Sequence, residues 1–205
     1  MRTLKRICLA SASPRRLELL QSLGLFVEVI PSDYDEPENP ALTPRELAQR
    51  HAREKLRAVT ARLGTAFAYP TLAADTVVDR DGAALNKPRD ADEARNMLAS
   101  LSGREHLVHT AVAIAFPDGE PSVEFCETTR VRFHELTSDE IADYVASGEP
   151  FDKAGGYGIQ GRAAALVDGI EGDFYTVMGL PLGHVVRTLR ARGYRTESRN
   201  AVDAL

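Results

Sequence analysis

Cysteine is scarce in this 205-residue sequence, and no motif uses the two that are present. Cys8 and Cys126 lie far apart, and neither belongs to a CxxC or mixed Cys/His pattern. We therefore expect two reduced thiols rather than a disulfide or a zinc site. The histidines lack the HExxH spacing of metalloproteases, and no GxSxG marks a serine nucleophile. Covalent catalysis is therefore not expected.

Long apolar runs are missing as well. The longest, residues 111–116, is far shorter than the roughly 20 apolar residues that cross a bilayer. The stretch "ICLASA" near the N-terminus imitates a signal-peptide cleavage site, but the apolar run falls short of the roughly 7–15 residues of a signal peptide. These absences predict a cytoplasmic protein that acts without a membrane partner.

Positive charge is not in excess, because the formal net charge is −5. This balance argues against a broad basic surface for a nucleic-acid polymer. An anionic ligand would need a local cluster of lysine and arginine side chains, or a metal ion. The length suits one domain, or one domain of two lobes around a cleft.

What is present is a mixture of helix and strand patterns. We interpret residues 1–205 as a single α/β domain with some α+β character, in which helices wrap a mixed, twisted sheet. Helices are predicted where capping residues precede apolar residues at helical spacing, over 14–23, 44–63, 91–102, 138–147 and 181–192. Strands are predicted over 6–10, 26–30, 71–79, 106–116, 122–133, 164–167 and 174–179. Hairpin turns are expected at Asp81-Gly82 and Pro117-Asp118-Gly119.

The first predicted helix begins with an unusual charge pattern. Ser13 is its expected N-cap and Pro14 its first residue, so Arg15 and Arg16 lie in the first turn. That end of a helix already carries about +0.5 of a charge. A phosphate bound by the arginines, the Ser11 and Ser13 hydroxyls and the free N–H groups would relieve the repulsion. Alternatively, both arginines extend into solvent.

Asp75 is a second anomaly, because it interrupts "TLAADTVVD", a run otherwise suited to burial. A buried carboxylate is costly unless it is paired, hydrogen-bonded or bound to metal. If the strand ended near Asp75, the side chain would lie at the carboxyl edge of the sheet, where α/β proteins bind ligands. It could instead cap a turn or pair with a structural arginine.

Several lone polar residues gain meaning only in combination. Lys55 lies on the shoulder of an apolar helical stripe, where a lysine either reaches solvent or lines a cleft. Lys87 is held extended by Pro88. Gln160 lies in "GGYGIQG", whose glycines let the backbone approach a ligand, although neither a P-loop nor a dinucleotide-binding assignment follows. Acids, cations and a glycine-rich loop together favour metal-assisted chemistry on a phosphate.

Taken together, these motifs resemble the Maf family of nucleoside triphosphate pyrophosphatases. The match covers roughly residues 7–190 and runs through "LASASPRRLELLQSLG", "HAREKLRA", "AADTVV", "NKPRDADEARNMLASLSGREHLVHTAV", "SGEPFDKAGGYGIQG" and "GLPL". The resemblance implies an ITPase-like fold of two lobes around a deep cleft, often as a homodimer. It also implies hydrolysis of a nucleoside triphosphate between the α and β phosphorus atoms, with Mg²⁺ or Mn²⁺ as cofactor. The segment "DKAGGYGIQG" is similar to the branch that acts on dTTP and UTP.

The resemblance further implies roles for individual residues. Asp75 matches the family's proton acceptor, and Arg15, Thr76 and Gln160 match positions tied to substrate choice. The other residues expected at the substrate or a metal are Ser11, Ser13, Arg16, Lys55 and Lys87 for the substrate, and Glu36 and Asp75 for the metal.

Two positions depart from the family pattern. Gly156 stands where alanine is expected in this branch, and Asn86 where glycine or an acid is commoner. Two alternatives stay open at this point: a pyrophosphatase for 7-methyl-GTP or a noncanonical nucleotide, and a protein that inhibits septum formation by binding. A kinase-like phosphotransferase is disfavoured, because the P-loop is missing.

Overall fold

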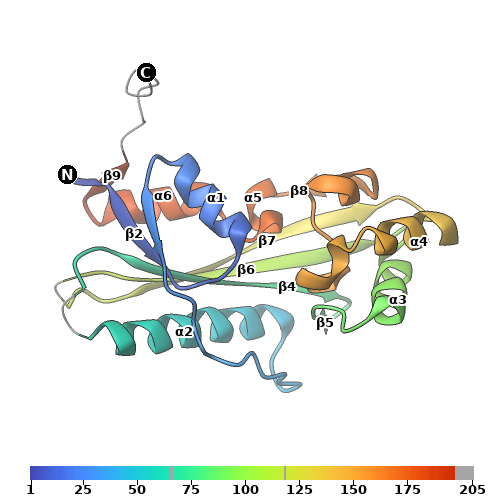
Figure 1. The fold of residues 1–205 in the computed structure, drawn as a ribbon, viewed down its shortest axis with the longest axis horizontal. Coiled ribbons are helices and arrows are strands. Elements are labelled where there is room, and N and C mark those ends of the chain that lie inside the picture. The colour runs from blue at the N-terminus through green and yellow to red at the C-terminus, as the bar shows by residue number, and fades with distance from the viewer. Residues whose placement is uncertain (65–66, 118, 197–205) are drawn as a thin grey trace.

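The computed structural model describes residues 1–64, 67–117 and 119–196. A seven-stranded sheet runs along the long axis of the molecule in the order β3-β2-β4-β6-β7-β8, with β5 paired to β4 alone (Figure 1). Its strands are β2 (Arg6–Leu9), β3 (Phe26–Val29), β4 (Thr71–Arg80), β5 (Ala83–Leu85), β6 (Glu105–Ala115), β7 (Val123–Phe133) and β8 (Val167–Glu171). A separate parallel pair joins β1 (Arg2–Leu4) to β9 (Tyr194–Thr196). Within the seven-stranded sheet, the β2–β3 and β2–β4 pairs are parallel and the remaining pairs are antiparallel, so the predicted mixed sheet is confirmed.

Helices cover both faces of this sheet. They are α1 (Pro14–Ser22), α2 (Pro44–Leu63), α3 (Ala91–Leu101), α4 (Ser138–Ala146), α5 (Phe174–Met178) and α6 (Leu182–Ala191). Figure 1 shows α2 beneath the sheet, α1 and α6 above it at one end, and α3 and α4 at the other end. The predicted capping boxes of α2 and α4 are both present, at Thr43 with Glu46 and at Thr137 with Glu140. None of the described helices is long and apolar enough to cross a membrane.

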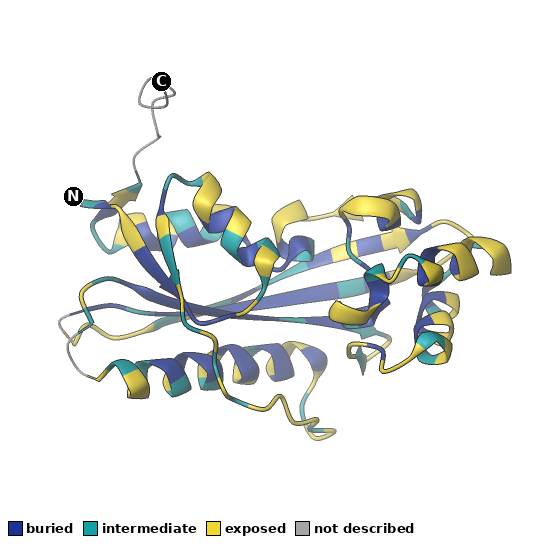
Figure 2. Ribbon diagram, viewed as in Figure 1, coloured by how far each residue is buried: buried dark blue, intermediate teal, exposed yellow. Residues whose placement is uncertain are grey.

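The apolar core divides into three clusters that share the long strands. One lies under α2, where Ala52, Leu56 and Val59 pack with Ala73 and Val77 of β4. A second fills the opposite face beneath α1 and α6, and a third joins α3 and α4 to the far end of β6 and β7. Figure 2 shows the central strands almost wholly buried, while the helices expose their outer surfaces. The two ends of the molecule are thus two lobes built on common strands, as predicted.

One edge of β4 is left open in its middle. β2 pairs with β4 only at Thr71 and Leu72, and β5 pairs only from Val78 to Arg80. Between these pairings, no described strand adjoins this edge. Because side chains alternate between the faces of a strand, Asp75 and Thr76 point to opposite faces of the sheet at this gap. A ligand that enters the gap can therefore meet side chains from both faces.

Two predicted strands near the C-terminus are wrong. The segment 174–179 was expected to be a strand because it is rich in aromatic and β-branched residues, but it forms the helix α5. Asp173 caps this helix through the backbone N–H of Thr176, and Gly179 ends it with φ +108. The expected strand at 164–167 is the end of a 3₁₀ turn, Gly161–Ala165, and β8 begins only at Val167.

The hairpin predictions agree with the structure as far as the described residues extend. Asp81 and Gly82 form the turn between β4 and β5, with Asp81 at φ 55. In the second hairpin β6 and β7 pair antiparallel as expected, although Asp118 at its turn lies outside the described residues.

Candidate active site

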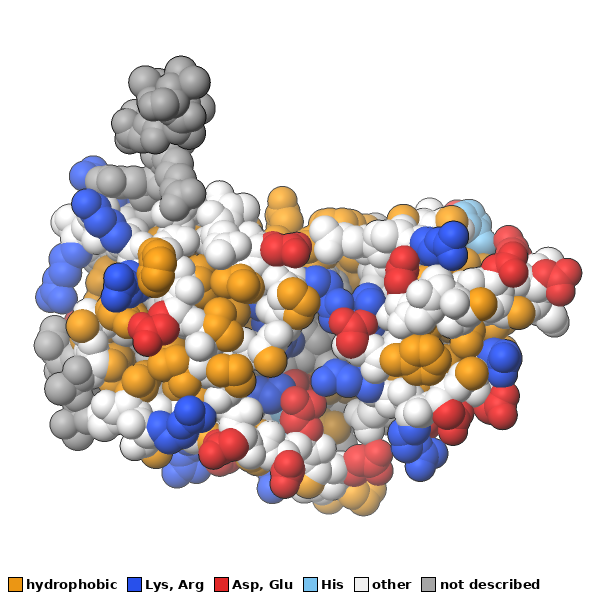
Figure 3. All heavy atoms as spheres, viewed as in Figure 1, with side chains coloured by type: hydrophobic (Ala, Val, Ile, Leu, Met, Phe, Trp, Pro, Cys, Tyr) orange, Lys and Arg blue, Asp and Glu red, His pale blue; other side chains and the backbone are white. Residues whose placement is uncertain are grey.

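A pocket of about 350 Å³ opens at the unpaired part of the β4 edge. Its walls come from both lobes, and Figure 3 shows charged side chains of both signs gathered near the middle of this face. The pocket brings together every residue that the sequence predicted for the site: Ser11, Ser13, Arg15, Arg16, Glu36, Lys55, Asp75, Thr76, Lys87 and Gln160. The structure thus brings these residues together, and their individual roles stay predictions.

Asp75 lies in the middle of β4 rather than at its end. The strand continues to Arg80, so the idea that the strand might end near Asp75 is wrong, and the gap in the sheet edge opens this carboxylate to the pocket instead. The residue is only 5% exposed. Its Oδ1 accepts a hydrogen bond from Nζ of Lys55 at 2.6 Å, and the same Nζ lies 2.6 Å from Oε1 of Glu36. Lys55 therefore joins two carboxylates inside the cleft, and does not reach out to solvent.

The two carboxylates are tuned in opposite directions. Burial raises the pKa of Asp75, the nearby charge of Lys55 opposes this shift, and Glu36 adds to it. Burial alone would raise the pKa of Glu36 too, but Lys55 and Lys87 outweigh it and hold the pKa below its usual value. Oδ2 of Asp75 accepts no hydrogen bond from the described part of the chain, so its lone pairs remain for a proton or a ligand.

Arg16 is buried without an acidic partner. The residue is 8% exposed, and its guanidinium donates from Nε to the carbonyl of Gly179 at 2.8 Å, from Nη1 to Oγ of Ser11 at 3.0 Å and from Nη2 to Oγ1 of Thr76 at 3.1 Å. No described carboxylate forms an ion pair with it. A guanidinium has five N–H bonds, so one hydrogen on each Nη is left for a ligand. The idea that both arginines extend into solvent is wrong.

Gly179 makes this arrangement possible. Its φ of +108 is rarely adopted by residues with a side chain. A Cβ there would lie 3.6 Å from Nε of Arg16 and 3.3 Å from Oγ1 of Thr76. Glycine thus allows the backbone conformation in which this carbonyl accepts from Nε of Arg16. Burial lowers the pKa of Arg16, but a guanidinium stays protonated in proteins at neutral pH.

The first turn of α1 adds further donors. Oγ of Ser11 accepts from Nη1 of Arg16 and from the backbone N–H of Ser13 at 3.2 Å. No acceptor among the described residues takes the Ser11 hydroxyl proton, which is left for a ligand. Ser13 is the N-cap, but its hydroxyl makes no capping bond and lines the pocket. This corner of the pocket presents hydrogen-bond donors at a helix N-terminus, which suits an anion.

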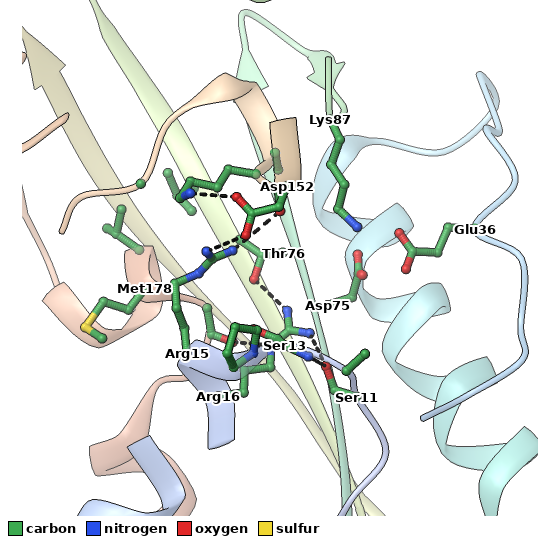
Figure 4. Close-up of a pocket in the computed structure, with 18 of the residues that line it drawn as sticks. Ser11, Ser13, Arg15, Arg16, Glu36, Asp75, Thr76, Lys87, Asp152 and Met178 are labelled. Atoms are coloured by element: carbon green, nitrogen blue, oxygen red, sulfur yellow. Dashed lines mark hydrogen bonds and ion pairs between the residues drawn. The ribbon is translucent and has the colours of Figure 1, made fainter. Parts of the chain in front are cut away.

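Asp152 is a pocket residue that sequence reasoning missed. Figure 4 shows it opposite the first turn of α1, where its Oδ2 lies 2.9 Å from Nη1 of Arg15. Its Oδ1 also accepts from Nζ of Lys153 at 2.6 Å. Burial alone would raise the pKa of Asp152, but the hydrogen bonds from Lys153 and Arg15 lower it. Arg15 needed an acidic partner, yet nothing in the sequence indicates one 137 positions away.

The glycine-rich wall depends on close backbone contacts. A Cβ on Gly155, which has φ +68, would lie 2.9 Å from a methyl group of Val78, and one on Gly158 would lie 2.6 Å from Cε of Lys153. Gly156, Gly158 and Gly161 do fit a GxGxxG spacing, but the segment connects 3₁₀ turns instead of a strand and a helix, so it is not a dinucleotide-binding turn.

Two further residues of this wall bear on the predictions. Gly156 has φ +73, which favours the glycine found here over the alanine expected from the family pattern. Gln160 is exposed at the pocket rim, where its amide is open to a ligand.

The acidic side of the pocket offers oxygen ligands of the kind that a divalent cation prefers. The described residues contain no group of three or more His, Cys, Asp or Glu side chains that could hold a metal on its own. Asp75 and Glu36, however, meet at one lysine, and Figure 4 shows their carboxylates close together with Lys87 reaching toward Glu36. Mg²⁺ commonly binds through one or two carboxylates together with substrate phosphates. The donor set therefore suits a metal that arrives with a phosphorylated ligand.

Fold and site together define an α/β protein whose pocket holds a carboxylate pair and a buried guanidinium. The model for the family described as Maf-like protein matches residues 6–192, and the chain belongs to the Maf family.

Among its relatives is the dTTP/UTP pyrophosphatase of Thermus thermophilus, 49% identical over 189 residues, which are 92% of this chain and 96% of that protein. The dTTP/UTP pyrophosphatase of Methylobacillus flagellatus is 50% identical over 188 residues, 92% of this chain and 93% of that protein. Among solved structures, the Staphylococcus aureus Ham1 protein aligns with a TM-score of 0.42 and 14% identity, over 63% of this chain and 72% of that chain.

Proposed function

We propose that this chain is a nucleoside triphosphate pyrophosphatase that hydrolyses dTTP and UTP. Water attacks the α-phosphorus, the bond to the bridging α–β oxygen breaks, and the products are the nucleoside monophosphate and pyrophosphate. One observation carries the proposal: a buried guanidinium, with spare donors and no acidic partner among the described residues, shares its pocket with a buried carboxylate of raised pKa. The names of the relatives support dTTP and UTP as the substrates.

The cations divide the work of holding the triphosphate. Arg16 and the Ser11 hydroxyl donate to phosphate oxygens from fixed positions, which avoids reorganisation during the reaction. Lys87 forms no ion pair within the described residues, so its charge is available to the phosphates as well. Arg15 adds a third cation once a phosphate replaces Asp152 as its partner. Lone lysines and arginines from distant segments thus become one binding surface.

Asp75 accepts the proton of the attacking water in this mechanism. Its free Oδ2 takes the proton while Oδ1 stays bonded to Lys55, which holds the carboxylate in one orientation. The raised pKa makes this carboxylate a stronger base than an ordinary aspartate, and general bases work best when their pKa lies near the working pH. Glu36 and Asp75 would hold Mg²⁺ or Mn²⁺, which supplies charge neutralisation and polarisation at the phosphate when bound.

Substrate choice is proposed to involve Arg15 and Gln160, whereas Thr76, the third position that the resemblance ties to it, accepts a hydrogen bond from Arg16 and acts through that guanidinium. The Gln160 amide has both donors and acceptors, as the edge of a pyrimidine base requires. Replacement of Gln160 by leucine should therefore change the ratio of UTP to GTP hydrolysis. An equal loss on both nucleotides would argue against a contact with the base.

A panel of triphosphates tests the proposed function directly. The protein is incubated with dTTP, UTP, GTP, 7-methyl-GTP and ITP, with Mg²⁺, Mn²⁺ or EDTA, and pyrophosphate and orthophosphate are measured separately. We expect pyrophosphate from dTTP and UTP, and none with EDTA. Release of orthophosphate, or no reaction with any triphosphate, contradicts the proposal, and a preference for 7-methyl-GTP or ITP assigns the chain to another branch.

Three companion predictions complete the proposal. If the protein instead acts as a binding inhibitor of septum formation, its effect on cell division should survive Asp75→Asn, whereas an effect that arises through hydrolysis should not. A homodimer and a cytoplasmic location stay predictions.

Sedimentation velocity tests whether the protein is a homodimer, and fractionation of cells tests whether it lies in the cytoplasm.

A further inference from the structure

A buried threonine stands behind the pocket with no role in the proposed function. Thr110 of β6 pairs in register with Thr76 of β4, so the two side chains lie on the same face of the sheet. Thr110 is fully buried and does not line the pocket. Its Oγ1 lies 3.0 Å from Oγ1 of Thr76 and 2.6 Å from the carbonyl oxygen of Thr176.

The direction of these hydrogen bonds follows from counting protons. A threonine hydroxyl donates one hydrogen bond, and a carbonyl can only accept. The proton of Thr110 therefore goes to the carbonyl of Thr176, so the proton of Thr76 goes to Thr110. Nη2 of Arg16 then donates to Thr76, since the guanidinium has no acceptor. The bonds run one way, from Arg16 through Thr76 and Thr110 to the backbone of α5.

The backbone after α5 closes this chain into a ring. Nε of Arg16 donates to the carbonyl of Gly179, and the N–H of Gly179 donates to the same Thr176 carbonyl that Thr110 uses. Both lone pairs of that carbonyl are then occupied. Hydrogen bonds along the chain from Arg16 through Thr76 and Thr110 to the Thr176 carbonyl polarise one another, and each member of the ring limits the freedom of the next. The guanidinium is thereby held from two sides, with its remaining donors free.

We propose that Thr110 is a positioning residue that fixes the guanidinium of Arg16 through Thr76. This inference rests on the proposed function, because it assigns Arg16 to the phosphates of the substrate. It also gives Thr76 an indirect part in substrate use. The single proton of Thr76 is spent on Thr110, so its hydroxyl cannot donate to the carbonyl oxygens of a pyrimidine. Because their link to the substrate runs through the guanidinium of Arg16, we expect Thr110 and Thr76 to affect all triphosphates alike.

The test compares Thr110→Val with Thr110→Ser. Valine removes the hydroxyl while keeping nearly the same shape, whereas serine keeps the hydroxyl. We expect Thr110→Val to raise KM for UTP, dTTP and GTP by a common factor of about fivefold, the change that follows from losing one neutral hydrogen bond. The Kd of inorganic pyrophosphate, measured by calorimetry, should rise by the same factor. Thr110→Ser should restore most of both values.

Thr129→Val is the matched control. Thr129 is a fully buried threonine on the neighbouring strand β7, and its Oγ1 donates to the carbonyl of Asp173 at the start of α5, without any link to Arg16. We expect near wild-type KM and pyrophosphate Kd for this variant. An equal loss in Thr129→Val would mean that Thr110 merely anchors α5, and it would overturn the inference.

Two further outcomes decide the matter. A changed UTP-to-GTP ratio in Thr110→Val, with pyrophosphate binding unaltered, would show base reading and would also overturn the inference. If Thr110→Val does not fold, as judged by circular dichroism, Thr76→Val removes the same link at a less buried position and should give the same uniform loss. Pyrophosphate binding needs no turnover, so it still tests the ring if wild-type protein hydrolyses no triphosphate and the proposed function fails.

Discussion

Two buried cations of the same pocket, Lys55 and Arg16, are held in opposite ways. Nζ of Lys55 lies 2.6 Å from each of two carboxylates, whereas the partners of Arg16 in the described part of the chain are two hydroxyls and a carbonyl. A lysine is a compact point charge that one pair of acids can satisfy, but a guanidinium is a planar fork whose donors point in fixed directions. The protein therefore pairs Lys55 with its own acids, whereas the described residues give Arg16 no acid, and we propose that its charge serves a ligand.

This difference has a cost in stability. A buried charge without an opposite partner is unfavourable, and Arg16 also lies in the first turn of a helix, where the dipole is positive. Neutral hydrogen bonds offset only part of the cost. An anion that binds there would relieve it, so phosphate ligands should stabilise the folded protein through their preference for the native state.

The largest expected effect comes from removing the base on the lysine side of the pocket. Asp75→Asn keeps an oxygen that can accept from Lys55, so the variant should fold. It cannot accept the proton of the attacking water, and we expect kcat to fall by about 10²- to 10⁴-fold, as for other general bases. The measurement is pyrophosphate release from UTP.

Asp79→Asn is the control for this loss. Asp79 also lies on β4 and is largely buried, but it bonds to His109 outside the pocket. Its variant should retain kcat near the wild-type value. A kcat of Asp75→Asn within a few-fold of wild type would remove Asp75 from the mechanism.

The second prediction replaces the guanidinium of Arg16 by an ammonium group. Arg16→Lys keeps the positive charge but loses the fork, so it cannot both bond to the Gly179 carbonyl and present two donors to a phosphate. We expect KM for UTP to rise by about 10- to 100-fold, the range for hydrogen bonds to charged groups. Arg45→Lys is the control, because Arg45 also bonds to neutral acceptors, Thr128 and the Cys126 carbonyl, but outside the pocket. Equal losses in both variants would contradict the special role of Arg16.

Arg15 and Arg16 show how far the sequence predicts this site. Their adjacent charges in a first turn indicated an anion site, and the turn does present donors to the pocket. The same pattern could not reveal that one arginine pairs with Asp152 while its neighbour pairs with neutral groups. Those partners come from segments remote in sequence, and their placement depends on how the two lobes pack.

The gap in β4 is another feature that no local pattern encodes. The apolar run around Asp75 correctly predicted a buried strand, but the opening depends on where β2 stops and β5 begins to pair. The role of Thr110 is equally absent from the local sequence pattern, because alternation along β6 predicts that its side chain is buried but not which groups it forms hydrogen bonds with. The helix α5 was missed because aromatic and β-branched residues outweighed the capping signal of Asp173 and the Gly179 stop.

The third prediction uses the pH dependence of kcat/KM to distinguish the role of Lys55 from that of Arg16. Asp75 must be ionised to act as a base, so kcat/KM should rise as the pH climbs through its raised pKa. The charged groups that face it are Lys55, Glu36 and Arg16, of which Lys55 and Arg16 lower this pKa and Glu36 raises it. Lys55→Met should therefore move the acid limb of the profile to higher pH, and Glu36→Gln should move it to lower pH. Arg16→Lys keeps its charge and should leave the limb in place. If neither Lys55→Met nor Glu36→Gln moves the limb, it does not report Asp75.

The smallest expected effect is a gain. Arg15 resembles Lys55 in having an acidic partner, but its ion pair with Asp152 is partly exposed, with side-chain exposures of 26% and 58%. Exposed pairs contribute about 0.2–1 kcal/mol, so a phosphate can displace Asp152 at little cost. Asp152→Asn should free Arg15 for the substrate and lower KM for UTP by up to about fivefold. The gain should vanish in the double variant Arg15→Ala/Asp152→Asn. A raised KM in Asp152→Asn alone would mean that the carboxylate orients Arg15 toward the substrate and does not compete with it, which would place Arg15 beside Arg16 among the fixed donors.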